Sequence, residues 1–175
     1  MIQFCHQIFL FLEGFCTLAN KYFDGLVPKY QGLNNIDLEV IKKTYQYPKL
    51  ISESLDNFKF RQAINLLVDL SRLGNKYLAD KEPWKLYKSG DLKRVEQIMF
   101  VSLQVCGMLA ILSEPFLPNA SKKIKEITNL KETKWTEINI HNPILKPQHK
   151  INKPELIFRK IEDKEIENQI NKLKF

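Results

Sequence analysis

The chain has 175 residues, 44% of them hydrophobic, and carries a formal net charge of +7 with a pI near 9.2. A chain of this length and composition can form one domain with its own hydrophobic core, so it needs no disulfides to hold the fold together. Lysine supplies most of the positive charge and would attract a polyanion as point charges, although a basic composition alone is a weak sign of nucleic-acid binding.

Three cysteines and three histidines are present, and their spacing matches no metal site. We therefore expect no disulfide framework and no metal, and free thiols of the kind found in a reducing cytoplasm. The apolar run 8–12 is too short to cross a bilayer, and no lysine or arginine precedes it. We expect neither a membrane helix nor a signal peptide.

The spacing of apolar residues, together with stop signals at glycine and proline, predicts seven helical segments. The first is apolar on almost every side, which is typical of a central helix buried among others. Asp24 and Gly25 should end it, and Asn34 or Asn35 should cap the next segment, which is either a short helix or a turn. The segments are 1–22, 36–44, 48–57, 58–80, 92–113, 119–128 and 163–173.

The strongest helix prediction is 58–80, and a stop and new cap at 89–91 separate it from 92–113. So short a connection makes these two long helices antiparallel neighbours. Lysines 122, 123 and 125 should lie on the exposed face of 119–128. The predicted buried face of 58–80 consists of Phe60, Ala63, Ile64, Leu67, Leu70, Ser71, Gly74 and Leu78.

From residue 131 onward the pattern changes to short apolar pieces and prolines, typical of an extended tail wrapped on the bundle or of a linker. The triplet 156–158 would dock as an extended piece. A charged helix over 163–173 would carry Ile166 and Ile170 on one side. We predict a helical domain over 1–130 and, over 131–175, an extended linker with a charged C-terminal helix.

The segment 74–85 combines a helix end with a tryptophan that directly follows a proline. Pro83 lacks an amide hydrogen and restricts the residue before it, so the helix should end near Lys81 or Glu82 and leave Trp84 on a fixed corner. A tryptophan held there would serve as a stacking platform. The alternative is a tryptophan that fills the gap between two helices.

No pattern in the chain predicts an active site. Glycine-rich phosphate loops, metal-ligand clusters and a nucleophile elbow are all missing from the sequence. Paired acids such as Glu162 and Asp163 suit a solvated helix face, and His6 on an apolar helix suits a core position. The residues by themselves indicate a binding or structural module rather than an enzyme.

Four separated motifs nevertheless resemble, in chain order, the anticodon-binding helical domain of methionyl-tRNA synthetase. The resemblance implies an all-α, antiparallel helix bundle of the class Ia synthetase type that binds the anticodon loop of methionine tRNA during translation. The cysteine and leucine enzymes of that class do not share the asparagine-to-tryptophan segment. The motifs are 20–25 (NKYFDG), 58–63 (FKFRQA), 74–84 (GNKYLADKEPW) and 115–118 (PFLP), and 146–173 resembles a peptide that follows the domain in some bacterial members.

In that family the tryptophan after the proline stacks on an anticodon base, a role that the resemblance assigns to Trp84. Asn75, Lys76, Lys81 and Lys85 are the matching polar neighbours. Unpaired bases of an RNA loop are commonly held by aromatic stacking, with base-edge hydrogen bonds supplying identity. The family's catalytic signatures are missing, so we expect no cofactor here: ATP and methionine would bind an absent catalytic domain, which a separate partner would have to supply.

The first helix departs from the family pattern. Members carry an asparagine and an arginine that hydrogen-bond the anticodon, where this chain has Leu10 and Gly14, which cannot replace them. A shifted alignment would place Gln3 and Gln7 in those roles. The other interpretation is a truncated or diverged copy, for which a helical protein-interaction or remnant module without RNA reading is the alternative function.

Overall fold

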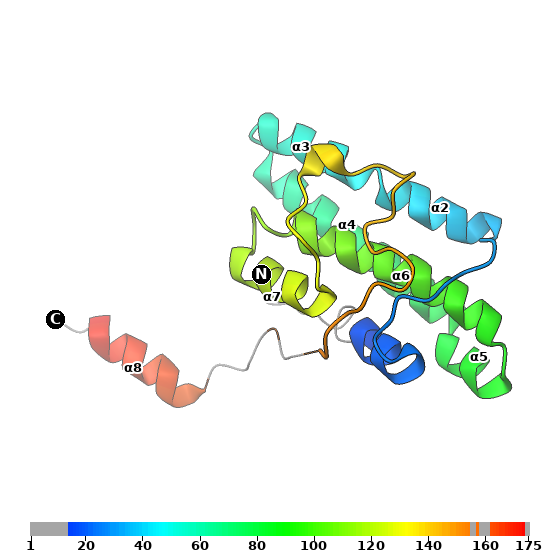
Figure 1. Cartoon of the computed structure of the whole chain (residues 1–175). Helices are drawn as coiled ribbons and strands as arrows, with labels where there is room; N and C mark the ends of the chain where they lie inside the picture. Colours follow the sequence, from blue (N-terminus) through cyan, green and yellow to red (C-terminus); the bar gives the residue numbers. More distant parts are fainter. Residues whose placement is uncertain (1–13, 155–156, 158–161, 174–175) are drawn as a thin grey trace.

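The structure, a computed structural model, describes residues 14–154, 157 and 162–173 (Figure 1). The described residues contain helices and no strands, which confirms the predicted all-α bundle. A helical segment at 14–23 comes first. It is followed by α2 (Asn35–Thr44), α3 (Tyr47–Asp56), α4 (Phe60–Lys81), α5 (Pro83–Ser89), α6 (Leu92–Leu112), α7 (Pro118–Thr128), the 3-10 turn η1 (Trp135–Glu137) and α8 (Asp163–Leu173).

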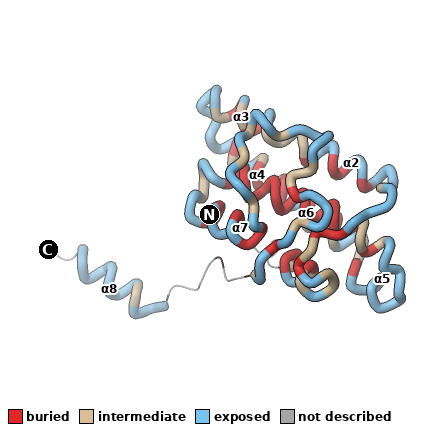
Figure 2. The backbone as a smooth tube through the Cα atoms, viewed as in Figure 1, coloured by how far each residue is buried: buried red, intermediate tan, exposed pale blue. Residues whose placement is uncertain are grey.

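The centre of the bundle is α6, in which every residue from Ile98 to Leu112 is buried (Figure 2). Helices α2, α4, α5 and α7 all pack on it. Helix α6 is long and apolar enough to cross a membrane, but 89% of that stretch is covered by the rest of the protein, as expected of a core helix. The prediction that the first helix is central is wrong for its described part, because 14–23 buries one face and exposes the other.

The predicted boundaries before α4 are confirmed by their backbone geometry. Asp24 and Gly25 both adopt positive φ angles (51° and 72°), which end the first helical segment. Gly25 is also required by contact, since a Cβ there would lie 2.9 Å from the Ile151 carbonyl oxygen. Asn34 caps α2 by accepting a hydrogen bond from the Asp37 amide at 2.9 Å, and Pro48 lies in the first turn of α3.

Helix α4 begins at Phe60, two residues later than predicted. Phe58 lies in the turn after α3 with φ of +57° and is 79% exposed. In this turn the Lys59 amide donates to the Ser54 carbonyl oxygen at 2.8 Å, and Phe60, the first residue of α4, is 55% exposed instead of buried. Of the other predicted core residues on α4, Ala63, Leu67, Leu70, Ser71 and Gly74 are buried and Ile64 and Leu78 are partly buried.

One predicted surface lysine of α7 is buried. Lys122 and Lys123 are exposed, but Lys125 lies on the side of α7 that packs on α6. The Lys125 amine forms an ion pair there with the Glu114 carboxylate, at 2.9 Å, and the Glu132 carboxylate lies 3.7 Å from it. A buried charge is tolerated when it is paired, and the sequence spacing gave no sign of this partner.

The segment 131–154 is a tail that packs on the bundle rather than a free linker. The side chain of Gln104 on α6 forms two hydrogen bonds with the Leu145 backbone. Its Nε2 donates to the Leu145 carbonyl oxygen at 2.8 Å, and its Oε1 accepts from the Leu145 amide at 3.2 Å. The Val27 amide donates to the His149 carbonyl oxygen at 2.9 Å, and the Ile151 amide donates to Gly25 at 2.8 Å. The tail therefore joins the first loop to the core helix, while a domain boundary at residue 130 stays a prediction.

Helix α8 is confirmed as a helix from Asp163 to Leu173. None of its residues is buried, and Ile166 and Ile170 are each about half exposed (Figure 2). Of the triplet predicted to dock before it, only Ile157 lies among the described residues, where it is buried and its carbonyl accepts a hydrogen bond from Lys123. Leu156 and Phe158 lie outside the described residues.

Candidate nucleic-acid interface

The chain turns sharply between α4 and α5, where the sequence predicted a corner. Helix α4 ends at Lys81, and Glu82 adopts a left-handed conformation with φ of 45° and ψ of 55°. Pro83 then occupies the first turn of α5 and is buried. The predicted break is confirmed, but a short helix follows it where the sequence predicts only a corner, because a proline that ends one helix also suits the first turn of the next.

Trp84 is the second residue of α5 and is 36% exposed. No ring of a described residue stacks on it. Trp84 therefore keeps about a third of its surface in solvent, while the rest is covered by the protein. Its neighbour Pro83 is anchored in the core, so the indole is held at the surface on a fixed backbone.

The predicted lysines near this corner differ in whether they form an ion pair with an acidic side chain. Lys76 contacts Asp80 at 3.0 Å and Lys85 contacts Glu82 at 2.7 Å, both in exposed pairs within a helical turn. Lys81 forms no ion pair with any residue that the structure describes. Exposed pairs contribute little, about 0 to 1 kcal/mol, so Lys76 and Lys85 are able to exchange a carboxylate for a phosphate.

Asn75 is partly buried and Lys76 is exposed, and both lie on α4 about one and a half turns before the corner. With a rise of about 1.5 Å per residue, these two lie about 8 to 9 Å along the helix axis from Lys81. The structure thus brings Lys81, Trp84 and Lys85 together at the corner and places Asn75 and Lys76 farther along the same helix.

Sequence reasoning missed an aromatic pair beside Trp84. Tyr87 of α5 stacks on Tyr22 with ring centroids 3.9 Å apart and ring planes at 12°. The Lys21 amine lies 5.8 Å from the Tyr22 ring centroid. Tyr87 lies three residues after Trp84, a helical spacing that would have revealed it had α5 been predicted.

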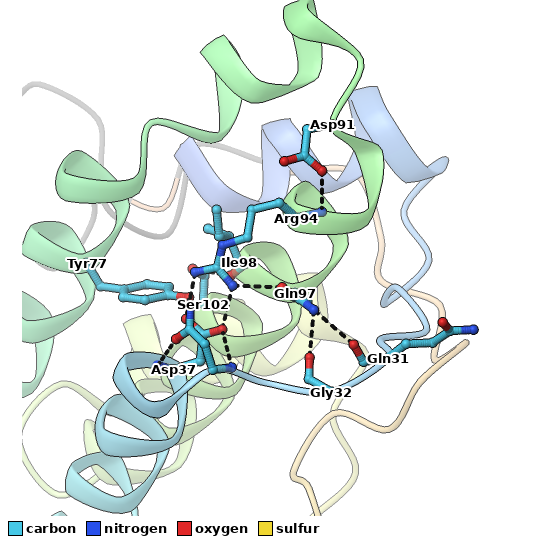
Figure 3. A network of polar contacts seen from close by, with 10 residues as sticks. Gln31, Gly32, Asp37, Tyr77, Asp91, Arg94, Gln97, Ile98 and Ser102 are labelled. Atoms are coloured by element: carbon cyan, nitrogen blue, oxygen red, sulfur yellow. Dashed lines mark hydrogen bonds and ion pairs between the residues drawn. The ribbon is translucent and has the colours of Figure 1, made fainter.

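A buried polar network holds α4 and α6 to α2 (Figure 3). Asp37 of α2 is fully buried, and its Oδ1 accepts hydrogen bonds from the Arg94 guanidinium at 2.8 Å and from the Tyr77 hydroxyl at 2.7 Å. Gln97 donates to the carbonyl oxygens of Gln31 and Gly32, at 2.9 and 2.7 Å. Because Tyr77 follows Asn75 and Lys76 directly on α4, this network fixes the turn that carries them.

The charges of this network are coupled. Burial alone would raise the pKa of Asp37, but the hydrogen bonds from Arg94 and Tyr77 and the guanidinium charge outweigh it and hold that pKa below its usual value. Burial, reinforced by the Asp37 carboxylate, raises the pKa of Tyr77 far above its usual range. The pair is therefore ionised and the tyrosine neutral at neutral pH.

Possible metal ligands are not gathered at any one place in the part of the chain that the structure describes. Among the described residues no group of three or more His, Cys, Asp or Glu is placed to hold a metal ion. Cys16 and Cys106 are buried and free, and burial raises the pKa of Cys16 to about 12. Of the first-helix positions, Gln3, Gln7 and Leu10 lie outside the described residues. Gly14 begins the described helix, and no described residue would lie within 4 Å of a Cβ there.

Solved structures share this helical architecture. The apo form of Mycobacterium tuberculosis methionyl-tRNA synthetase superposes with a TM-score of 0.79 at 19% identity, over 87% of this chain and 31% of that chain. A second structure of that synthetase, with methionyl-adenylate bound, gives the same values. The chain therefore has the fold of the helix bundle found in methionyl-tRNA synthetases.

Sequence comparison identifies the family. Residues 27–174 match the model of the anticodon binding domain of methionyl tRNA ligase, and the chain belongs to this family. The methionine-tRNA ligase of Christiangramia forsetii is 42% identical over 169 residues, and that of Bacteroides fragilis 43% over 163 residues, with 93% of this chain covered in each case. The chain spans about a quarter of the length of these curated relatives, 24% of each.

Proposed function

We propose that this chain binds the anticodon loop of a methionine tRNA, with Trp84 as the surface on which one base stacks. The observation that carries the proposal is the exposed indole of Trp84 on a backbone fixed by buried Pro83, with Lys81 and Lys85 beside it. Such a loop presents unpaired bases and a polyanionic backbone, and the corner offers a surface for each.

Each residue would have a separate part in the complex. Trp84 would contribute stacking worth about 1 to 3 kcal/mol per base. Asn75 has an amide donor and acceptor that suit the edge of a base, which is where identity is distinguished. Lys76, Lys81 and Lys85 would neutralise phosphates as point charges.

The attachment of methionine to tRNA would belong to a larger assembly. ATP and methionine would bind the catalytic part of a methionyl-tRNA ligase, either joined to this domain or supplied as a separate partner. The buried free thiols of Cys16 and Cys106 suit a reducing compartment, so we place this assembly in the cytoplasm.

Tryptophan fluorescence tests the proposal directly. The chain has two tryptophans, so Trp135→Phe leaves Trp84 as the single reporter. We expect an RNA hairpin with the loop anticodon CAU to quench that reporter at low salt, and Trp84→Ala to weaken binding about 5- to 150-fold in filter assays. The proposal would be contradicted if no hairpin quenched the fluorescence and if Trp84→Ala bound the hairpin as tightly as the parent.

A second candidate function, protein interaction, is favoured by the aromatic pair at the turn between α3 and α4. Phe58 and Phe60 meet edge to face, with centroids 6.3 Å apart, and both are largely exposed. Exposed large apolar groups that lie together mark interaction surfaces. The partner we propose for this pair is the catalytic part of a methionyl-tRNA ligase.

Co-expression tests this second function. The catalytic part of the C. forsetii enzyme would be produced without its matching region and purified with this chain. We expect one complex in size-exclusion chromatography, lost when Phe58 and Phe60 are both changed to Ser and retained in Leu50→Ser, which alters an exposed apolar residue elsewhere on α3. Separate elution of the two parent chains would rule this partner out.

A further inference from the structure

Helix α5 presents two aromatic rings to solvent. Trp84 and Tyr87 are three residues apart, so their Cβ atoms lie about 5 to 6 Å apart on one side of the helix. They are exposed to almost the same extent, 36% and 38%. No described ring stacks on Trp84, and the one described ring stacked on Tyr87 is that of Tyr22. Trp84 and Tyr87 therefore form separate surfaces rather than one stacked pair.

Tyr87 is fixed in place by a residue from a distant part of the chain. Tyr22, at the end of the helical segment 14–23, covers one face of the Tyr87 ring at 3.9 Å and is itself met edge-on by Phe23 at 6.5 Å. Figure 1 shows that segment beside α5. A seven-residue helix has little stability of its own, so this stack both steadies α5 and sets the plane of the Tyr87 ring.

The surroundings of the pair are basic. Lys85 and Lys88 lie on α5 on either side of Leu86 and Tyr87, and the Lys21 amine lies above the Tyr22 ring. The acids nearest to Tyr87 in sequence are Glu82 and Asp91. Glu82 is paired with Lys85, and the Asp91 side chain caps α6 by accepting a hydrogen bond from the Arg94 amide. Lys21 and Lys88 form no ion pair with any described residue, and Lys85 is paired only in an exposed contact with Glu82. A rigid ring among these lysines suits an aromatic ligand that carries negative charge, as a nucleotide does.

We propose that Tyr87, backed by Tyr22, is a second stacking surface, which takes the nucleotide next in sequence to the one stacked on Trp84. This inference rests on the proposed function of Trp84. Proteins that hold single strands stack successive bases on successive aromatic side chains, and two rings one helical turn apart provide that arrangement. The tyrosine pair thereby extends the interface from one base to two.

Hairpins that lack one base test the assignment. The parent protein, Trp84→Ala, Tyr87→Ala and Tyr87→Phe would be titrated with the CAU hairpin and with versions in which each loop nucleotide in turn is abasic. We expect Tyr87→Ala to bind the complete hairpin about 5- to 150-fold more weakly and Tyr87→Phe to bind within about twofold of the parent. The hairpin that lacks the base stacked on Tyr87 should bind Tyr87→Ala and the parent with equal affinity. That position should be adjacent to the one at which Trp84→Ala and the parent bind equally.

The abasic series separates stacking from mere support of α5. If Tyr87→Ala weakens binding by the same factor on every abasic hairpin, the ring does not touch a base and the inference is overturned. Tyr87→Leu fills similar space without a ring plane and replaces Tyr87→Ala if that variant unfolds; parent-like binding by it overturns the inference too. Failure of the Trp84→Ala comparison would instead contradict the proposed function itself, so the two failures are distinguishable.

Discussion

At the level of single residues, Asp37 connects more of the molecule than any sequence pattern indicated. It completes the cap of α2, where the Asn34 amide donates to its Oδ2 at 3.2 Å, and it also pairs with Arg94 and Tyr77. The cap was predictable from the asparagine three residues before it. The pairing was not, because Arg94 is 57 residues away in sequence and only the packing of α2 on α6 brings the two together.

We expect Arg94→Ala to lower the free energy of unfolding by about 3 to 5 kcal/mol, because it leaves a buried carboxylate without its partner. The control is Arg72→Ala, which breaks the exposed pair with Asp69 at 3.0 Å and should cost less than about 1 kcal/mol. Urea denaturation at pH 7 measures both changes. Similar losses in the two variants would show that the buried pair has no special role.

The same pair predicts a dependence of stability on pH. The folded-state pKa of Asp37 is depressed below its unfolded value of about 3.9, so the stabilisation is complete above about pH 5 and is lost as the pH falls through the folded pKa. Urea denaturation between pH 6 and pH 3 should therefore show a steeper loss for the parent than for Arg94→Ala. Parallel curves would contradict the depressed pKa.

At the level of elements, the helices with clear apolar spacing were predictable, and the ones that depend on tertiary contact were not. The spacing and caps of α4 and α6 are local, so their sequence defines them to within two residues. Helix α5 has only seven residues and packs on α6 and on Tyr22, so it is too short for apolar spacing to reveal it, although Pro83 and Gly90 suit its two ends. The corner at Trp84 was predictable because Pro83 restricts its neighbours, whereas its companion Tyr87 required the fold.

The tail 131–154 behaves in this structure as part of the bundle, held by the buried side chain of Gln104. We expect Gln104→Leu to lower the free energy of unfolding by about 2 kcal/mol or more, since it leaves both the amide and the carbonyl of Leu145 buried without their partner. Hydrogen exchange should accelerate most at the amides of Leu145, Gln148 and Ile151. Acceleration confined to α6, with the tail amides unchanged, would mean that Gln104 does not anchor the tail.

For the whole molecule, an excess of seven positive charges favours any polyanion, so specificity has to come from where unpaired charge and exposed rings coincide. The corner between α4 and α5 is such a place, since Lys81 there has no carboxylate partner among the described residues while Trp84 and Tyr87 face solvent. Lys76 and Lys85 each hold a nearby acid, and binding a phosphate would first require them to release it.

This difference predicts unequal contributions to RNA binding. Each lysine that contacts a phosphate of single-stranded RNA adds about 0.7 to the slope of log affinity against log salt, because it releases condensed counterions. We expect Lys81→Gln to lower that slope by about this amount for the CAU hairpin and Lys76→Gln to lower it less. Lys122→Gln, an exposed lysine on α7, is the control for total charge. If all three variants reduce the slope equally, the molecule attracts RNA by its net charge alone, and the corner is not where the backbone binds.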